Sequence, residues 1–349
     1  MRRLVSILIG FFVLGVAAVM IGVATEAATL INGAGATFPF PLYSKWFSEF
    51  HKIDSDVQIN YQSIGSGGGI RQFTEHTIDF GATDIPMTQE QLAKSPTPIV
   101  HIPTVVGAVV LTYHLPGVPS GLKLSPEVIA DLFLGKIKNW NDARIAQMNP
   151  DVTLPAESVT VVRRSDGSGT TAIFTDYLAK ISPEWKSRVG TGTSVNWPVG
   201  LGGKGNDGVV SLIQQAPGSI GYTELVFAKI NHLSLATIKN RAGEFIVPDL
   251  NSVTLAATSV LKSLPKDYRI SITDPSLKGA YPLSGFTYIL VHDSMPKAKG
   301  EKIIKFLHWA LAAGQNYAQK LYYAPLPSEM VKKVNQTIDA IHLVPDQHE

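Results

Sequence analysis

The chain has 349 residues, 45% of them hydrophobic, and a formal net charge of +2. This is enough apolar material for one large domain or two ordinary ones. A net charge so close to zero provides no basic field that could hold a nucleic acid or an anionic membrane, so we exclude both partners. The sequence contains no cysteine, which rules out disulfides, thiolate metal sites, cysteine nucleophiles and a cysteine-linked lipid.

The N-terminal segment has the composition of a secretion signal. Two arginines precede the apolar run Leu4–Val23, and the small residues around Ala27 suit a signal peptidase. We therefore expect residues 1–27 to be a signal peptide that is cleaved near Ala27. The apolar run also reaches the length of a membrane span, so a retained anchor stays open as the alternative.

Two segments near the start of the remaining chain lead from small residues into expected helices. In residues 33–41 (GAGATFPFP), Thr37 stands just before a helix with a strongly apolar face, where a hydroxyl caps. In residues 64–70 (IGSGGGI), Ser66 precedes three glycines in the same way. Both segments are compatible with plain helix capping. Taken one at a time, each is better explained by capping, but each could also offer the unpaired amides of a helix N-terminus to an anion.

The middle of the chain alternates strand-like runs with amphipathic helices, which is an α/β pattern. Residues 79–86 (DFGATDIP) are typical of a strand that ends in a turn, and Ile102 to Thr112 is long and apolar enough for a buried strand. Ser125, Pro126 and Glu127 carry the start signals of a helix. Further on, Phe286 to Val291 predicts another buried strand, and Gly300 to Gly314 a helix.

Residues 163–171 (RRSDGSGTT) form the most informative segment. They follow a β-type run and precede apolar residues at helical spacing, which predicts a strand, a tight turn and a helix. Arg164 and Asp166 point the same way if the segment is extended. Alone, this could be a surface turn with an N-cap serine and a solvated ion pair. Together with the two earlier helix starts, it favours a shared anion-binding site.

The sequence contains little that indicates an enzyme. The glycine-rich residues 200–205 (GLGGKG) lack the GK[ST] ending of a nucleotide-binding loop, and neither G-x-S-x-G nor H-E-x-x-H occurs. The nine histidines show no metal-ligand spacing beyond a loose pair near the C-terminus. A phosphate-ester hydrolase would need an activated nucleophile or paired metals. We therefore expect that the protein is not an enzyme and that it binds neither a metal ion nor a cofactor. A structural or adhesive protein would leave the three helix starts unexplained.

Six segments in order, GAGATFP, IGSGGG, DFGATD, RRSDGSGTT, NWPVGLGGKGNDG and PGSIGY, resemble the periplasmic phosphate-binding proteins of the high-affinity phosphate ABC importers. The resemblance extends from about Thr29 to about Pro327. It implies a periplasmic monomer that delivers inorganic phosphate to the permease subunits of an importer. The ligand set it implies, with Phe38 acting through its backbone N–H, is Thr37, Phe38, Ser66, Asp84, Arg164, Asp166, Ser168, Gly169 and Thr170.

The same resemblance implies a two-lobed α/β fold of the type II periplasmic-binding class, with the ligand cleft between the lobes. Residues 28–107 and 284–349 would form a discontinuous first lobe, and residues 108–283 the second. The hinge would lie close to Val106 to Ala108 and Leu283 to Gly285.

A carboxylate in an anion site needs a physical explanation, and Asp84 has one. Phosphate carries at least one proton near neutral pH, whereas sulfate carries none. An ionised aspartate can only accept hydrogen bonds, so it favours the protonated ligand and repels the bare one. Asp84 would thus disfavour the alternative ligands, sulfate and molybdate. Asp166 would orient the guanidinium of Arg164.

Overall fold

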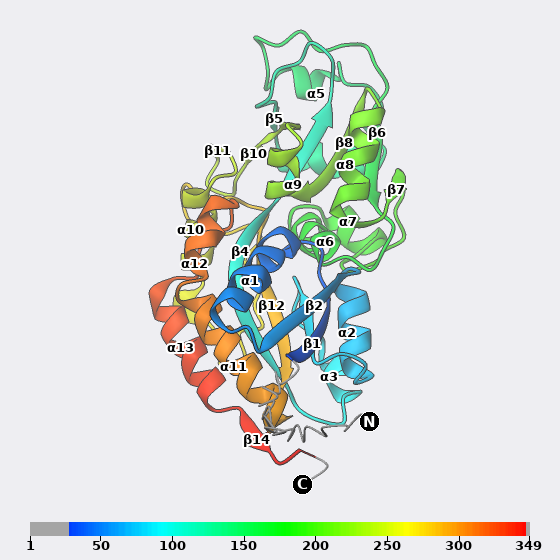
Figure 1. Ribbon diagram of the computed structural model, residues 1–349. Helices are drawn as coiled ribbons and strands as arrows, with labels where there is room; N and C mark the ends of the chain where they lie inside the picture. The colour runs from blue at the N-terminus through cyan, green and yellow to red at the C-terminus, as the bar shows by residue number, and fades with distance from the viewer. Residues whose placement is uncertain (1–27, 347–349) are drawn as a thin grey trace, which may run out of the picture.

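A computed structural model describes residues 28–346 of the chain. The expected signal peptide and its cleavage site lie outside this range. Between residues 28 and 346, no helix combines the length and the apolar character needed to cross a membrane. Figure 1 shows two lobes stacked along one long strand, β4.

One continuous sheet of nine strands runs through both lobes in the order β2-β1-β3-β12-β4-β8-β6-β7, and the ninth strand, β9, also pairs with β4. Its strands are β1 (Thr29–Gly35), β2 (Val57–Ser63), β3 (Phe80–Thr83), β4 (Ile99–His114), β6 (Thr160–Arg164), β7 (Leu201–Gly203), β8 (Ser219–Glu224), β9 (Ser234–Leu235) and β12 (Ser284–His292). Two small sheets contain β5 (Lys123–Leu124), β10 (Thr237–Lys239) and β11 (Phe245–Ile246), and β13 (Ser294–Pro296) and β14 (His342–Val344).

The long strand β4 changes partner halfway along its length. Its first part, as far as Ala108, pairs antiparallel with β12, and Ala108 itself lies opposite Ser284. From Val109 onward its partner is β8, again antiparallel. Strands β1, β2 and β3 run parallel on one side of this point, and β6, β7 and β8 run parallel on the other. Strand β4 therefore pairs with strands of both lobes.

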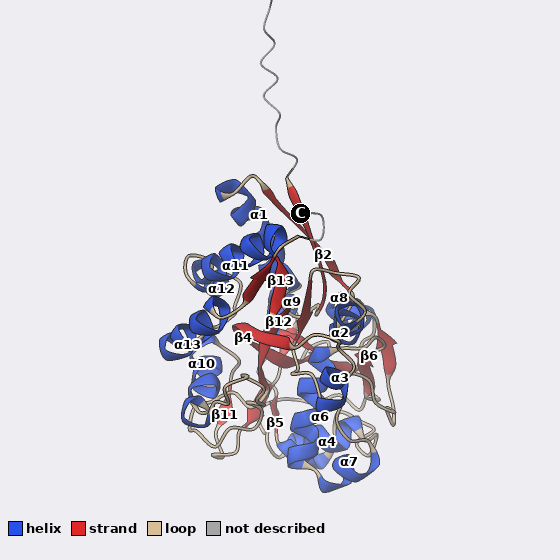
Figure 2. Ribbon diagram, turned by 90° about the horizontal axis from the view of Figure 1, so that it is seen from below, coloured by secondary structure: helices blue, strands red, loops and turns tan. Residues whose placement is uncertain are grey.

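Helices cover the sheet on both sides; Figure 2 shows α11 to α13 along one side of the strands and α2 and α3 along the other. The helices are α1 (Phe40–Ile53), α2 (Ser66–Thr74), α3 (Gln89–Ala93), α4 (Pro126–Phe133), α5 (Ala143–Ala146), α6 (Gly169–Ile181), α7 (Pro183–Arg188), α8 (Gly205–Gln215), α9 (Leu225–Ile230), α10 (Leu250–Thr258), α11 (Lys297–Leu311), α12 (Gln315–Lys320) and α13 (Ser328–Asp339), with a short 3-10 turn at Leu261–Ser263.

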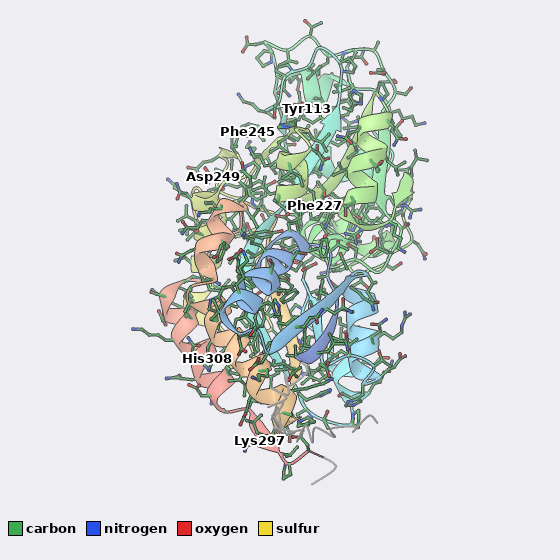
Figure 3. The ribbon with its side chains drawn as sticks, viewed as in Figure 1. Tyr113, Phe227, Phe245, Asp249, Lys297 and His308 are labelled. Atoms are coloured by element: carbon green, nitrogen blue, oxygen red, sulfur yellow. The ribbon has the colours of Figure 1, made fainter. Side chains whose placement is uncertain are left out.

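The core follows the predicted apolar runs. Strand β4 is buried at all but its terminal residues and β12 at all but its last, as expected of strands that are covered on both faces. Tyr113 and Phe227, labelled in Figure 3, are buried in the second lobe. The indole N–H of each fully buried tryptophan donates to a backbone carbonyl, for example that of Trp46 to Gly314 at 2.7 Å.

The predicted fold class, a two-lobed α/β fold, is confirmed. Helix α4 begins as predicted, with the Ser125 hydroxyl accepting from the Val128 amide at 3.4 Å. The helix expected over residues 300–314 is displaced, because α11 spans Lys297–Leu311 and α12 follows separately. Its N-cap residue, Pro296, makes no side-chain capping bond, so the usual N-terminal signal was absent.

Candidate functional site

The site is built where strands end and helices begin. Strand β3 ends one residue before Asp84, and β6 ends at Arg164. Helices α2 and α6 begin at Ser66 and Gly169, and Thr37 and Phe38 lie in the turn between β1 and α1. Because this turn, β3 and α2 belong to one lobe whereas β6 and α6 belong to the other, the predicted residues converge from both lobes.

Arg164 supplies the fixed positive charge. Only 2% of the residue is exposed. Its Nε donates to Asp166 Oδ1 at 2.8 Å and its Nη2 to Asp166 Oδ2 at 2.5 Å, a two-pronged arrangement that holds the guanidinium plane. Burial alone would raise the pKa of Asp166, but the bonds from Arg164 and the paired charge outweigh it and lower this pKa. Asp166 therefore stays ionised and orients Arg164, as the sequence predicted.

The third guanidinium nitrogen of Arg164 faces the other predicted residues. Its Nη1 donates to the hydroxyl of Thr170 at 3.3 Å and to the side-chain oxygen of Asn206 at 3.4 Å. These contacts are long compared with the pair to Asp166. The remaining donor capacity of Arg164 is thus directed toward the start of α6.

Asp84 supplies a titrating acid. It is 3% exposed, and its Oδ1 accepts from the hydroxyl of Thr287 at 2.8 Å. Its Oδ2 accepts from the hydroxyl of Ser66 at 3.3 Å. Burial raises the pKa of Asp84 to about 7, even though Thr287, the charge of Arg164 and Ser66 all act in the opposite direction. Near neutral pH, this carboxyl group can therefore give or take a proton.

The two lobes touch at glycines. The Gly67 amide donates to the Gly167 carbonyl at 2.9 Å, which joins the start of α2 to the turn before α6. A Cβ atom on Gly169 would lie 2.3 Å from Ser66 Oγ and 2.5 Å from Asp84 Oδ2. Gly65 has a φ of 88°, which favours glycine, and any side chain there would collide with Asp166. Only residues without a Cβ permit this approach.

Backbone amides complete the site. Within residues 28–346, the amides of Phe38, Gly169 and Thr170 donate no hydrogen bond. Gly169 and Thr170 are the first residues of α6, where the helix offers no acceptor and its dipole is positive. The Ser168 hydroxyl caps the same helix by accepting from the Thr171 amide at 3.0 Å. Buried, unpaired amides beside a fixed arginine are suited to oxyanion binding.

Two capping expectations were wrong. Thr37 does not cap α1: its hydroxyl instead accepts from the side-chain amide of Asn206 at 2.9 Å, across the lobes. Ser66 is the first residue of α2 rather than its cap, and its hydroxyl bonds Asp84. Both hydroxyls are engaged with site residues, so helix capping does not account for them.

The sequence interpretation missed three residues at the site. The Asn206 side chain contacts Thr37 and Arg164 from the start of α8, and its oxygen also accepts from the Thr223 hydroxyl at 3.2 Å. It stood within the glycine-rich segment 196–208, which was the available signal. Thr287 lies inside an apolar strand, and Tyr323 follows α12, far along the chain. Neither position carries a local motif.

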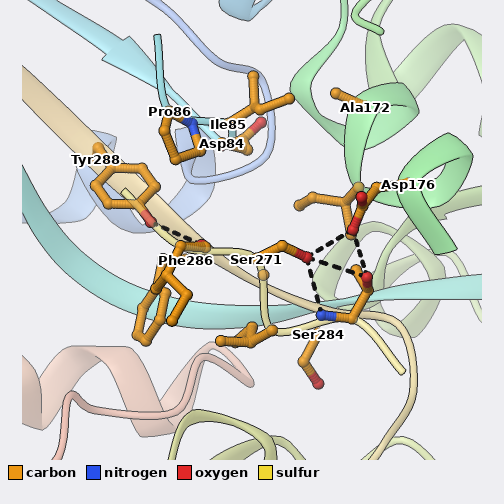
Figure 4. A pocket seen from close by; sticks show the side chains of 14 residues that line it. Asp84, Ile85, Pro86, Ala172, Asp176, Ser271, Ser284, Phe286 and Tyr288 are labelled. Atoms are coloured by element: carbon orange, nitrogen blue, oxygen red, sulfur yellow. Dashed lines mark hydrogen bonds between the residues drawn. The ribbon is translucent and has the colours of Figure 1, made fainter. Parts of the chain in front are cut away.

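A side cavity of about 80 Å³ adjoins Asp84 (Figure 4). It lies between α6 and the segment that precedes β12, and its polar lining includes Asp176, Ser271 and Ser284. A volume of this size is large enough for several water molecules. Asp84 therefore borders a space that can hold a small number of waters, which is compatible with proton exchange.

Comparisons with known proteins place the chain in a family. Residues 22–313 match the model of the PBP superfamily domain. The chain is 44% identical over 312 residues to the phosphate-binding protein PstS of Pasteurella multocida, covering 89% of this chain and 90% of that one. It is 39% identical to the phosphate-binding protein PstS of Methanocaldococcus jannaschii, covering 87% and 84%.

A solved structure supports the fold. The phosphate-binding protein from Stenotrophomonas maltophilia superposes with a TM-score of 0.67 at 18% identity, covering 88% of this chain and 93% of that one. Such low identity speaks for the fold alone, whereas the identities above cover most of both chains. By its sequence over nearly its whole length, the chain belongs to the PstS family of solute-binding proteins within the PBP superfamily.

Proposed function

We propose that this protein binds inorganic phosphate between its lobes and delivers it to the permease of an ABC-type phosphate importer. One observation carries the proposal: a buried arginine held by Asp166, the unpaired amides of Gly169 and Thr170, and a buried acid of raised pKa, Asp84, meet at one place. The names of the PstS relatives agree with this ligand. The proposed ligands are the nine residues predicted from the sequence.

The proposed selectivity depends on Asp84. Burial of its ionised form costs free energy, and the hydrogen bonds from Thr287 and Ser66 offset this cost only in part. A protonated phosphate oxygen can donate a further hydrogen bond to it, whereas sulfate and molybdate, which lack a proton, cannot. A charge-assisted hydrogen bond of this kind contributes about 1.5–3 kcal/mol. Phosphate is therefore favoured over the alternative oxyanions.

Binding is proposed to close the two lobes, residues 28–107 with 284–349 and residues 108–283. The hinge would lie near Val106 to Ala108 and Leu283 to Gly285. The exchange of strand partners between Ala108 and Val109 supports a flexing point there. Donors from both lobes reach one ligand only when the cleft is shut.

The other parts of the proposal concern the setting of the protein. We expect an exported, periplasmic monomer whose signal peptide ends near Ala27, and permease contacts on both rims of the cleft. Among residues 28–346, no group of three or more His, Cys, Asp or Glu side chains could hold a metal. Family membership supports a binding protein rather than an enzyme. A chromogenic phosphate ester should therefore not be cleaved.

Small-angle scattering tests the proposal. Phosphate should reduce the radius of gyration of the protein, and sulfate at the same concentration should leave it unchanged. The Arg164→Lys variant serves as control, because an ammonium cannot reproduce the fork of the guanidinium and should close only at higher phosphate concentrations. An unchanged radius at saturating phosphate, together with no heat of titration, would argue against the proposed function.

A further inference from the structure

A second buried acid lies next to the site and is absent from the predicted ligand set. Glu224 ends β8 and is completely buried. Its Oε2 accepts from the Val226 amide at 2.9 Å, at the start of α9. Its Oε1 has no hydrogen-bond partner within the described residues. A buried carboxylate with an unpaired oxygen is costly, which suggests that the group is not ionised.

The hydrogen bonds of the Tyr323 hydroxyl also indicate that Glu224 is not ionised. It lies 2.6 Å from the carbonyl oxygen of Phe38 and 3.3 Å from Glu224 Oε2. A phenol hydroxyl has one proton to donate. That proton goes to the Phe38 carbonyl, because this contact is the shorter one and a carbonyl oxygen can only accept. The hydroxyl then turns a lone pair toward Glu224. A carboxylate there would face lone pair against lone pair, whereas a carboxylic acid can donate.

The path from Glu224 ends at the backbone carbonyl of Phe38, whose own amide is a proposed phosphate ligand. Phe38 and Tyr323 pack with their ring centroids 6.3 Å apart over Gly107 of β4, where a Cβ atom would lie 2.3 Å from the Phe38 ring. The Phe38 carbonyl accepts from Tyr323, and this hydrogen bond fixes the orientation of the turn that contains the Phe38 amide. Glu224 comes from the second lobe, whereas Tyr323 and Phe38 lie in the first.

We propose that Glu224 is a positioning residue which, as a neutral carboxylic acid, donates to Tyr323 and so holds the Phe38 turn in its anion-binding orientation when the lobes are closed. This inference rests on the proposed function, since it concerns the same site. It assigns Glu224 no contact with the ligand. Glu224 then donates to the Tyr323 hydroxyl, which donates to the Phe38 carbonyl, and these two hydrogen bonds connect the lobes.

The electrostatic surroundings agree with a neutral Glu224. Burial raises its pKa well above the ordinary value, and the charge of Asp84 adds to this, against the bonds from the backbone amides of Val226 and Leu225. The other titratable or charged groups that face it are Tyr323 and, beyond Asn206, Arg164. Asn206 separates Glu224 from the arginine by accepting from both the Glu224 amide and Arg164.

Three variants test the inference by phosphate titration calorimetry. Glu224→Gln keeps a neutral donor of nearly the same shape, so its phosphate affinity should stay within about threefold of the wild type. Glu224→Ala and Tyr323→Phe both break the chain and should weaken phosphate about 10-fold or more. Thermal unfolding without phosphate shows whether each variant folds. Equal weakening in Glu224→Gln and Glu224→Ala, or wild-type affinity in Glu224→Ala, would overturn the inference.

A spectroscopic measurement on folded protein keeps the test independent of affinity. Infrared difference spectra with labelled glutamate should show a protonated carboxyl band in the closed wild type that is missing in Glu224→Gln. The ratio of wild-type to Glu224→Gln affinity should be constant near neutral pH, because Asp84 and the ligand titrate equally in both. Absence of the band would overturn the inference. Failure of the wild type itself to bind phosphate would instead refute the proposed function.

Discussion

Replacing Asp84 by asparagine tests the selectivity argument in a shape-conserving way. The side chain is buried, and Thr287 and Ser66 hold its two oxygens at 2.8 and 3.3 Å. In Asp84→Asn, the amide oxygen can keep the bond from Thr287, and the NH₂ group replaces an oxygen that could only accept. The variant therefore removes a charge and adds a donor without opening a cavity.

The expected magnitudes follow from these contacts. Phosphate exchanges a charge-assisted hydrogen bond for a neutral one, so its binding should weaken by about 1–2 kcal/mol, or about 5-fold to 30-fold. Sulfate escapes repulsion by a buried carboxylate, which at about 4 Å and an effective dielectric constant of about 20 amounts to about 4 kcal/mol per unit charge. Because Asp84 can also escape this repulsion by taking up a proton near its pKa of about 7, the penalty on sulfate is limited to about 1.4 kcal/mol for each pH unit above that value. At pH 8, sulfate should therefore gain about 10-fold in affinity in Asp84→Asn, and the preference for phosphate over sulfate should fall by about two orders of magnitude.

Calorimetric titration of phosphate, in competition with sulfate at concentrations far above that of phosphate, measures both affinities in both proteins. Arg164→Lys is the matched control, because loss of the guanidinium fork should weaken phosphate and sulfate together and leave their ratio nearly unchanged. Equal losses for the two anions in Asp84→Asn would show that Asp84 does not select the ligand and would leave it as a structural turn residue.

Three further outcomes are expected. Gly169→Ala should prevent closure, because the new Cβ would lie 2.3 Å from Ser66 Oγ, so scattering should show no contraction with phosphate although circular dichroism shows a folded chain. Asn206→Ala removes the acceptor shared by Arg164 and the Glu224 amide and should cost about 1–3 kcal/mol of stability in denaturant titrations. Folding raises the pKa of Asp84. The free energy of unfolding should therefore be highest below the pKa of an unfolded aspartate, about 4, and should fall as pH rises from there to about 7. Relative to Asp84→Asn, ligand-free wild type should lose up to about 1.4 kcal/mol per pH unit in that window.

The sequence predicted those parts of the site that sit on local motifs. Arg164 ends strand β6 and Asp166 lies two residues further on, so their pairing agrees with the expectation that alternate side chains of an extended segment point the same way. The helix start at Gly169 follows from small residues before apolar periodicity, and the buried strands β4 and β12 from continuous apolar runs. In each case one short stretch of chain contains the whole signal.

Residues whose role depends on distant partners could not be predicted in this way. Thr37 resembled a helix cap, but the bond from Asn206 in the other lobe engages its hydroxyl. Thr287 lies in an apolar strand and reaches Asp84 only because β12 pairs with β3. Tyr323 meets Glu224 across a separation of 99 residues in the sequence. Tertiary pairing creates these contacts, and no local pattern encodes them.

Titration calorimetry of the processed chain shows whether the cleft binds phosphate and rejects sulfate. Phosphate should titrate with a stoichiometry of one to one, and sulfate at the same concentration should produce no binding heat and should not displace phosphate. Binding of both anions with similar affinity, or of neither, would mean that the cleft is not a phosphate-selective site.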